Sequence, residues 1–477
     1  MNTDKKYDLI VVGSGAAGLA AAVTFAETTE GAGTAIAILE RSPIEERGGS
    51  TRWTGAFMRL NADSTLDTNY TKLLQDISGG HADVAYLEKF AEEVPTTVKF
   101  IQDRGVQVIW PGVPLPTTFS GGEVTMNSPA LPIGGGKSIV EALAATLESH
   151  DNVDFYYDTE ALRLTTSNEG AVDGILIRGK DGLQKKLSGD NVILACGGFE
   201  GNYEVLSRYV GAGAYDLPRI APGIANNRGD GLRMALELGA DTAGQFDALH
   251  VEPVDTRTTA ADAVLYGYTA GIFVNADAKR FFDEGQNTWD NTFEKIGYEI
   301  WQNQDQKAYW VADAKTLAIP GIENLFISDI PPEEADTIDE LAIKLGIDPT
   351  ALAVTVAEFN AAVSGGEFDT SRLDGKHTTG LTPNKSNWAT PIDQGPFIGF
   401  PLTGAICFVY GGIRTDLNGR VVSPAGVPIR GLYAAGELTG LYYNEYPPAT
   451  SVLRSLTFGR LAAAHIAQSV RVAEAAR

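Results

Sequence analysis

The first forty residues alternate between short apolar runs and segments rich in glycine or alanine. Tyr7 to Val12 (YDLIVV) is a β-branched apolar run, typical of a strand buried on both faces of a parallel sheet. The glycine-rich segment Gly13 to Gly18 follows at once, and the Ala-rich stretch LAAAVTFAE after it predicts a helix. A second apolar run from Thr34 to Leu39 predicts another strand, ending at Glu40. These segments together predict a complete βαβ unit.

Further along the chain, the spacing of apolar positions predicts more elements of both kinds. Residues 70–104 carry apolar residues at three- and four-residue spacings, which predicts a helix, and the segment SIVEALAATLES after GGGK at 134–137 predicts another. The runs VDFYYDT, ALRLTT and AVDGILIRG predict short strands of a small β-meander. A further parallel strand is expected from Asn191 to Gly198, and a helix in LRMALELGA after RGDG at 228–231.

The character of the chain changes between residues 250 and 400. Aromatic and polar residues are mixed there, and its later part is dominated by helical segments such as TIDELAIKLGI and PTALAVTVAEFNAAV. After residue 400 the strand-and-glycine pattern returns. We therefore predict an α/β domain with a parallel sheet and a β-meander, made of residues 1–249 and 401–477. An α+β domain of residues 250–400 is inserted into it.

Composition narrows the class of protein. At 477 residues the chain is long enough for two or more domains. Its formal net charge of −24 disfavours binding to nucleic acid and to anionic membrane surfaces. The two cysteines, Cys196 and Cys407, lie in apolar runs and form no CxxC motif, so buried free thiols are expected and no metal site. The sequence shows no signal peptide and no membrane span, and predicts a cytoplasmic protein.

The glycine segment carries the chemistry of dinucleotide binding. It reads GxGxxG, stands between a predicted strand and a predicted helix, and has the acidic Glu40 about 20 residues past its last glycine. Gly13 permits the tight turn, Gly15 lets the backbone approach a pyrophosphate, and Gly18 lets helix and strand pack closely. The helix N-terminus favours phosphate, and Glu40 can accept the ribose hydroxyls. The first domain is therefore expected to be Rossmann-like.

Two further glycine segments favour FAD over NAD. Residues 48–55 (GGSTRWTG) follow the second strand, where a backbone can lie along the rest of a long cofactor. Residues 431–437 (GLYAAGE), near the C-terminus, predict a strand that ends in a glycine turn. This arrangement returns the C-terminal segment to the N-terminal fold, as a cofactor that spans both requires.

The whole set of motifs resembles one flavoprotein family, that of the fumarate reductases, succinate dehydrogenases and 3-ketosteroid dehydrogenases. Within it, the chain looks most like the tricarballylate dehydrogenase branch. The segments that carry the resemblance are VVGSGAAGLAAA, LERSP, GGSTRWTG, GGGKSIVEAL, ILACGGFEGN, NNRGDGLRMALELGA, GIFVNADAKRFFDEG, YGGIRTD, RGLYAAGELTG and TFGRLAA.

The resemblance implies FAD in an extended pose, with a capping domain closed over the flavin. The reaction would be hydride exchange between the flavin N5 and an activated CH–CH or C=C bond of a small substrate. The residues that it implies for the cofactor are Gly13, Gly15, Ala16, Ala17, Gly18, Glu40, Arg41, Gly48, Gly49, Ser50, Thr51, Thr54, Gly55, Ala161, Cys196, Gly197, Gly198, Asn227, Asp230, Gly436, Glu437, Ser451, Val452 and Leu453. Relatives that attach FAD covalently use a His in the loop that matches residues 48–55. That loop has none here, so noncovalent FAD is expected.

Three positions depart from the fumarate reductase pattern. Trp289 stands where that branch has an Arg proton donor, the segment from Cys407 to Gly412 replaces its paired histidines, and Tyr446 falls where it has an Arg for the substrate carboxylate. Ordinary fumarate reduction is therefore not expected.

The candidate catalytic residues each have two readings. Arg280 contacts the substrate or pairs with Asp283 or Glu284, and Arg52 contacts the substrate or anchors its loop. Arg454 lies near the flavin N1–C2=O edge or on a helix surface. His250 faces the substrate or is a domain-boundary His. Tyrosines near the expected cleft serve the ketosteroid branch as base and as hydrogen-bond donor to the carbonyl, while most buried tyrosines are merely core residues. They are Tyr266, Tyr268, Tyr442, Tyr443 and Tyr446.

Several functions stay open at this point. The leading one is a dehydrogenase or reductase with a small, carboxylate-bearing substrate of the tricarballylate type, and the alternative is a cyclic-ketone desaturase of the ketosteroid type. An electron-transfer subunit and a non-catalytic FAD-binding protein are less favoured. The electron donor or acceptor and the oligomeric state are not indicated.

Overall fold

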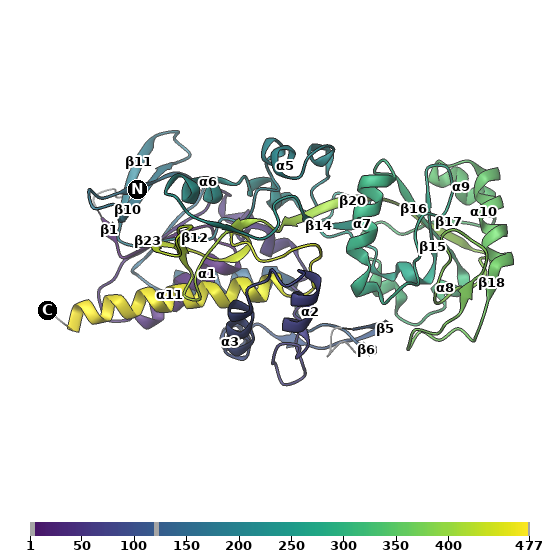
Figure 1. The fold of residues 1–477 in the computed structure, drawn as a ribbon, viewed down its shortest axis with the longest axis horizontal. Helices are drawn as coiled ribbons and strands as arrows, with labels where there is room; N and C mark the ends of the chain where they lie inside the picture. Colours follow the sequence, from purple (N-terminus) through teal and green to yellow (C-terminus); the bar gives the residue numbers. More distant parts are fainter. Residues whose placement is uncertain (1–4, 119–123, 476–477) are drawn as a thin grey trace.

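The computed structural model describes residues 5–118 and 124–475. The chain forms two parts joined by a pair of long strands (Figure 1). One part contains both ends of the described chain, and the inserted part lies beyond the strands β14 (Leu249–Asp255) and β20 (Phe397–Val409). The predicted insertion of residues 250–400 starts within β14 and ends within β20, nine residues before that strand does. The α/β class with an inserted α+β part is confirmed.

The centre of the first part is a six-stranded sheet in the order β22-β23-β12-β2-β3-β8. Five of these strands pair in parallel, and β22 (Arg420–Val422) is the antiparallel edge strand. The parallel strands are short and apolar, as strands covered on both faces must be. They are β2 (Leu9–Val12), β3 (Ile36–Leu39), β8 (Val153–Tyr156), β12 (Val192–Leu194) and β23 (Pro428–Ala434).

Helices cover one face of this sheet and a second sheet covers the other. The helices share one apolar core and are α1 (Ala16–Thr28), α3 (Val84–Gln102), α4 (Gly135–Glu148) and α11 (Ser451–Ala475). The second sheet, in the order β1-β11-β10-β9, packs with α6 (Asp230–Glu237) in a separate core. Its strands are β1 (Lys6–Tyr7), β9 (Glu160–Thr166), β10 (Val172–Arg178) and β11 (Gln184–Gly189).

Two sequence predictions in this part were wrong in detail. The segment VDFYYDT was assigned to the meander, but it forms β8 and pairs in parallel with β3. It is reached by a helix, α4, as a parallel crossover requires. The single helix expected over residues 70–104 is two helices, α2 (Tyr70–Ile77) and α3. They separate at Gly79-Gly80, and Asp83 then caps α3 by accepting a hydrogen bond from Tyr86 N.

The inserted part is a five-stranded antiparallel sheet with helices around it. In it β20 pairs with β14, β16 (Ala308–Asp313) and β17 (Glu333–Ala335), and β16 also pairs with β15 (Ile272–Asn275). The helices are α7 (Phe293–Asn303), α8 (Ala314–Leu317), α9 (Ile338–Leu345) and α10 (Pro349–Ala362). No helix in residues 5–118 or 124–475 has the length and apolar character needed to cross a membrane.

Candidate active site

One large cavity, of about 250 Å³, runs from the turn after β2 to the first residues of the inserted part. At one end it is lined by the glycine turn with Glu40 and Arg41. At the other end its walls come from the inserted part and from β20. These walls are His250, Glu252, Asp262, Tyr266, Trp289, Phe293, Cys407 and Phe408. We call this second region the cap end of the cavity.

The glycine turn has the geometry that a pyrophosphate needs. Gly13 has φ +104°, and a Cβ on it would lie 2.3 Å from Ala195 O, so only glycine fits. A Cβ on Gly18 would lie 2.0 Å from Gly13 O, which explains the close approach of α1 to the turn. Helix α1 then begins at Ala16, after the N-cap residue Gly15, which has no side chain to cap it; Ala16 N donates to Thr51 Oγ1 at 3.1 Å, and the first residues of α1 line the cavity. Its N–H groups and the positive end of its dipole therefore face the cavity.

Glu40 is fixed at the edge of this end of the cavity. Its Oε1 accepts a hydrogen bond from Ser42 N at 2.8 Å, and its Oε2 accepts from Ser14 Oγ at 2.5 Å. Arg41 lies beside it and donates to Asp230 at 2.5 Å. A carboxylate in this place suits ribose hydroxyls, as the spacing of the motif predicts.

A second helix N-terminus opens on the same cavity. Helix α11 begins at Ser451, and Ser451, Val452 and Arg454 line the wall. The Arg454 side chain is buried and donates to Thr439 O at 3.0 Å and Gly436 O at 3.4 Å. Its Nε has no partner among the described residues. The helix-surface reading of Arg454 is therefore wrong, and its charge is available to the cavity.

Most residues expected to bind the cofactor surround this cavity, but five do not line it. Those that line it are Gly13, Gly15, Ala16, Ala17, Glu40, Arg41, Gly49, Ser50, Thr51, Thr54, Ala161, Cys196, Gly197, Asn227, Asp230, Gly436, Glu437, Ser451 and Val452. The others lie behind the wall, where they pack the turns that shape it, and are Gly18, Gly48, Gly55, Gly198 and Leu453. A Cβ on Gly198, for example, would lie 2.4 Å from Glu437 Oε1.

These features fit FAD. The glycine turn at the N-terminus of α1 suits the pyrophosphate, Glu40 suits the ribose, and the N-terminus of α11 with Arg454 suits negative charge on a flavin ring. When bound, the flavin would supply or accept the hydride of a redox reaction. Binding and orientation of the substrate, and proton movement, then fall to the side chains of the cap end.

The centre of the cap end is a chain of hydrogen bonds through His250. Its Nδ1 lies 2.5 Å from Glu294 Oε2, and its Nε2 lies 2.7 Å from Glu252 Oε1. Tyr410 donates to the other oxygen of Glu294 at 2.5 Å. Burial would by itself lower the pKa of His250, but the Glu294 charge and the hydrogen bonds to both carboxylates outweigh it and raise this pKa to about 10. His250 is therefore an imidazolium at neutral pH, and donates from both nitrogens.

The cap end also carries a second buried carboxyl group. Asp262 accepts a hydrogen bond from Gly55 N at 3.2 Å. Burial and the charge of Glu252 raise the pKa of Asp262 to about 7. Around neutral pH this group can therefore gain or lose a proton.

Tyr446 lines the cavity, and its hydroxyl oxygen is held at the start of α11. Its oxygen accepts hydrogen bonds from Thr450 N at 2.8 Å and from Ser451 N at 2.9 Å, at the start of α11. Both contacts are acceptor contacts, so the O–H remains able to donate. Burial raises the pKa of Tyr446, which keeps this hydroxyl protonated.

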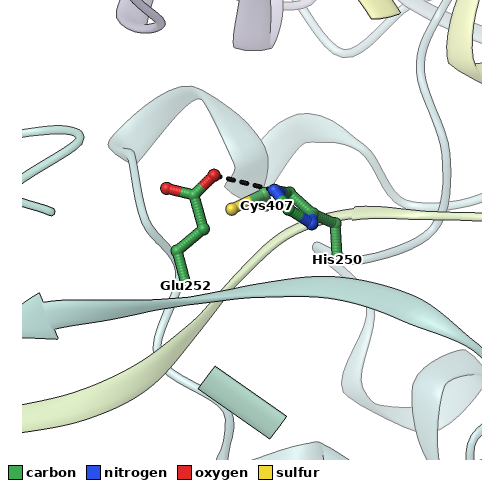
Figure 2. A group of neighbouring side chains, drawn as sticks. All are labelled: His250, Glu252 and Cys407. Atoms are coloured by element: carbon green, nitrogen blue, oxygen red, sulfur yellow. Dashed lines mark hydrogen bonds and ion pairs between the residues drawn. The ribbon is translucent and has the colours of Figure 1, made fainter. Parts of the chain in front are cut away.

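Cys407 lies beside His250 and Glu252, and Figure 2 shows the three side chains together. Their potential ligand atoms lie within 4.8 Å of one another, so the group has the chemistry to hold a metal ion. Burial and the charge of Glu252 raise the pKa of the Cys407 thiol well above its usual value, which keeps it protonated. Both cysteines of the chain are free thiols, as expected, although they line the cavity and are half-buried rather than fully buried.

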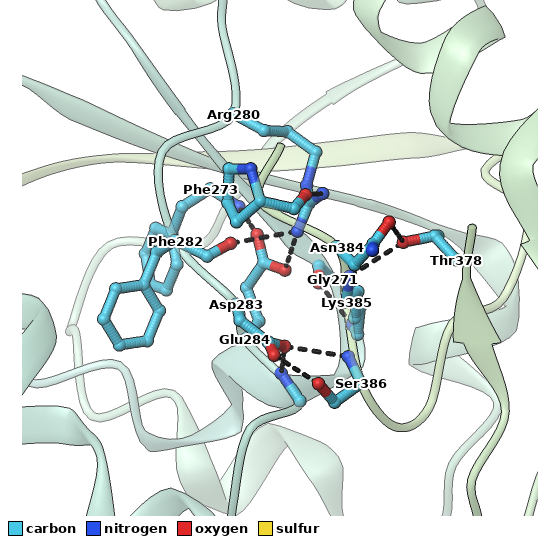
Figure 3. Close-up of polar contacts among 12 residues, drawn as sticks. Gly271, Phe273, Arg280, Phe282, Asp283, Glu284, Thr378, Asn384, Lys385 and Ser386 are labelled. Carbon is cyan, nitrogen blue, oxygen red and sulfur yellow. Dashed lines mark hydrogen bonds and ion pairs between the residues drawn. The ribbon is translucent and has the colours of Figure 1, made fainter. Parts of the chain in front are cut away.

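Arg280 and Arg52, two of the expected catalytic residues, do not line the cavity. Arg280 donates to Glu284 at 2.6 Å and to the carbonyls of Pro383 and Phe282, within the inserted part (Figure 3). Arg52 donates to Glu141 on α4 at 2.6 Å, which anchors the loop that it belongs to. In each case the structural alternative holds, because a carboxylate near in space satisfies the cation.

Tyr268 lies away from the cavity as well. It is fully buried in the inserted part and donates its hydroxyl to Trp289 O at 2.9 Å. Of the predicted catalytic residues, the structure brings His250, Tyr446 and Arg454 to the cavity wall.

Sequence reasoning missed three acidic residues of this site. Glu252 is two residues from His250 on β14, so both side chains point to the same face of that strand, a signal that the sequence did contain. Asp262 and Glu294 have no comparable signal. Glu294 comes from α7, 44 residues after its partner His250, and only the tertiary fold brings the two together.

Taken together, fold and cavity define a flavin-dependent oxidoreductase. A family model, that of the FAD binding domain, matches residues 8–451. The chain belongs to this family.

Similar proteins agree with this assignment. A vinyl phenol reductase of Lactiplantibacillus plantarum is 25% identical, over 97% of this chain and 96% of its own length. Some longer curated relatives are matched over only about half of their length. The structure of a flavocytochrome c3 fumarate reductase in an open conformation matches with a TM-score of 0.78 at 21% identity, covering 98% of this chain and 79% of that one. A 3-ketosteroid Δ4-(5α)-dehydrogenase from Rhodococcus jostii matches with a TM-score of 0.70 at 24% identity, covering 98% of both chains. The family resemblance seen in the sequence is thus confirmed.

Proposed function

We propose that this protein is an FAD-dependent oxidoreductase acting on the CH–CH or C=C bond of an uncharged, conjugated ring compound, such as a cyclic enone or a vinyl phenol. The observation that carries this proposal is the composition of the cap end. Its walls are aromatic and its charged groups are carboxylates held around one imidazolium.

A carboxylate-bearing substrate of the tricarballylate type is less well supported. An anionic substrate needs cations, but Arg52 and Arg280 are bound to Glu141 and Glu284, and Arg454 lies on α11, where the flavin ring is expected. At the cap end, Glu252 and Asp262 would repel a substrate carboxylate. These features support an uncharged substrate over a tricarboxylate.

Tyr446 and the aromatic walls support the ring compound. The Tyr446 hydroxyl can donate to a ketone oxygen, which draws electrons from the bond that reacts. Tyr266, Trp289 and Phe293 offer apolar surfaces to the ring. Among the substrates that relatives are named for, a 3-oxosteroid carries such a ketone, and a vinyl phenol offers a flat conjugated ring to the aromatic walls.

Proton movement falls to the network around His250. The imidazolium is a proton store within hydrogen-bond reach of Glu252, and Glu252 itself lines the cavity. This hydrogen-bonded network can deliver a proton to a substrate carbon that is being reduced, or take one from a substrate carbon that is being oxidised. Noncovalent attachment of FAD and a cytoplasmic location stay predictions. The electron donor or acceptor is likewise a prediction, of a partner not yet identified.

An anaerobic titration tests the proposal in both directions. Oxidised holoenzyme would be mixed with cyclic ketones, 4-ethylphenol, succinate or tricarballylate, and loss of the flavin absorbance would be followed. Chemically reduced holoenzyme would be mixed with cyclohexenone, 4-vinylphenol or fumarate, and return of the absorbance would be followed. Reaction with the ketones, the enone or the phenols supports the proposal, and reaction with the carboxylates alone overturns it. Tyr446→Phe should slow the ketone reaction about tenfold or more while flavin content stays unchanged.

A further inference from the structure

Glu252 has one carboxylate oxygen occupied and one open. Its Oε1 accepts from His250 Nε2 at 2.7 Å, whereas its Oε2 is buried and has no hydrogen-bond partner among the described residues. The Glu252 side chain is 9% exposed and lines the cap end of the cavity. Figure 2 shows its second oxygen directed away from both His250 and Cys407. A buried acceptor without a partner costs free energy, and a ligand that donates to it recovers that cost.

Glu294, the carboxylate on the other side of His250, differs from Glu252 in its hydrogen bonds. Glu294 accepts from His250 through Oε2 and from Tyr410 through Oε1, and Tyr446 N also approaches Oε1 at 3.4 Å. Both oxygens of Glu294 are therefore occupied. Of the two carboxylates that hold His250, only Glu252 has an oxygen available to a molecule in the cavity.

The charges around Glu252 restrict what that molecule can be. An anion is repelled by Glu252 and by ionised Asp262. The His250 imidazolium, whose Nε2 lies 2.7 Å from Glu252 Oε1, already supplies a cation to this carboxylate. Other cationic side chains on the cavity wall lie elsewhere, with Arg41 and Arg228 near the start of α6 and Arg454 on α11. An uncharged donor of one hydrogen bond fits the single open oxygen of Glu252 and the aromatic walls.

We propose that Glu252 Oε2 accepts a hydrogen bond from the ring hydroxyl of an uncharged phenol, and so makes the cap end a phenol-binding subsite. This inference rests on the proposed function, because it assumes that the ring of the substrate enters the cap end. It goes beyond that function by naming the group on the substrate and the atom that recognises it. A phenol combines a flat apolar ring for the aromatic walls with a single O–H for the open oxygen.

A matched pair of ligands tests the inference. The probes are 4-chlorophenol and its methyl ether, 4-chloroanisole, which have similar shape and no CH–CH bond to oxidise. Their dissociation constants would be measured with oxidised holoenzyme from the change in flavin absorbance. A hydrogen bond to a charged acceptor corresponds to about tenfold or more in affinity. We expect the phenol to bind at least about tenfold more tightly than the ether, and equal affinities would overturn the inference.

Two variants show which carboxylate causes the preference for the phenol over its methyl ether. In Glu252→Gln the preference for the phenol should fall to about threefold or less, because the charge of the acceptor is lost. In the matched variant Asp262→Asn, which alters the other buried carboxyl group of the cap end, the preference should remain. A preference that persists in Glu252→Gln and disappears in Asp262→Asn would assign the hydroxyl to Asp262 and overturn the inference. Flavin content shows that each variant is folded.

A measurement on the unchanged protein guards against variants that do not fold. Free 4-nitrophenol ionises with a large change in absorbance, and the bound form can be read against holoenzyme alone. A carboxylate acceptor should keep the bound probe protonated, so its affinity should fall as pH rises through its solution pKa. A bound probe that is more ionised than the free probe would show an anion site and overturn the inference.

The result can be separated from a metal effect and from failure of the proposed function. If dialysis against EDTA abolishes the phenol preference, a metal held by His250, Glu252 and Cys407 mediates binding, and the direct hydrogen bond is refuted. The chlorophenol pair measures binding without turnover. The proposed function can therefore fail in the titration of ketones, enones and phenols while the subsite is confirmed. Turnover of cyclic ketones together with equal affinities for the pair would instead leave the function standing and refute the subsite.

Discussion

His250 and Glu294 form a hydrogen-bonded ion pair, with 2.5 Å between Nδ1 and Oε2, at the point where β14 enters the inserted part. The pair joins a strand that leads out of the first domain to helix α7, which packs across it. Because it is buried, its charge state affects both stability and the site.

We predict that Glu294→Gln flattens the pH dependence of stability. The folded-state pKa of His250, about 10, lies above the unfolded value of about 6.5. Its contribution to stability is therefore complete below pH of about 6.5 and is lost as pH rises through about 10. The free energy of unfolding, measured with urea from pH 6 to 10, should fall less steeply in Glu294→Gln than in the original protein. The exposed Glu358→Gln is the control, and identical slopes in all three proteins would contradict the prediction.

Gly15→Ala should separate folding from cofactor binding. A Cβ on Gly15 meets Gly48 O only at 3.5 Å, an ordinary contact, but Gly15 lines the cavity where the pyrophosphate is expected. The apo-protein should unfold at an unchanged temperature, while FAD affinity, measured by fluorescence quenching, drops at least about tenfold. Gly112→Ala, with open space around its Cβ, should change neither. Full FAD affinity in Gly15→Ala would place the pyrophosphate elsewhere.

Arg280→Met should destabilise the inserted part without changing ligand recognition. It leaves Glu284, which is fully buried, without its cation, and breaking such a pair costs about 3–5 kcal/mol. The double variant Arg280→Met with Glu284→Gln should recover much of that loss. Unfolding by urea measures both variants. If Arg280→Met instead abolished turnover with unchanged stability, Arg280 would act on the substrate after all.

Lys385, which also lies in the inserted part, should make stability depend on pH in the opposite direction to His250. Its Nζ donates to Gly271 O at 2.6 Å (Figure 3) and to Thr269 O at 2.7 Å. Burial lowers the pKa of Lys385 to about 8. The unfolded chain then binds more protons than the folded one between pH of about 8 and 10.5, so this residue makes stability rise with pH in that window. Lys385→Met should lose that rise, whereas the exposed Lys307→Met should keep it. Unfolding free energies at pH 8 and 10 give the comparison.

The sequence by itself determined the cofactor half of the site. The strand, the GxGxxG turn, helix α1 and Glu40 lie within about thirty residues of each other, and local backbone requirements fix most of their geometry. Gly13 had to be glycine because of its positive φ, whatever the rest of the chain does. The motif after β23 and the start of α11 were likewise recognisable, and both reach the cavity.

Tertiary structure decided the half of the site where the substrate is expected. The sequence left Arg52 and Arg280 with two readings each, because an arginine shows no local sign of whether a carboxylate will meet it. In the folded chain Glu141 pairs with Arg52 and Glu284 pairs with Arg280. For the same reason, VDFYYDT could be recognised as a strand but not assigned to its sheet, since pairing depends on partners far along the chain. The Glu252–His250–Glu294 arrangement exists only because α7 packs on β14. Burial there gives these charges their pKa values, and burial is a property of the folded chain.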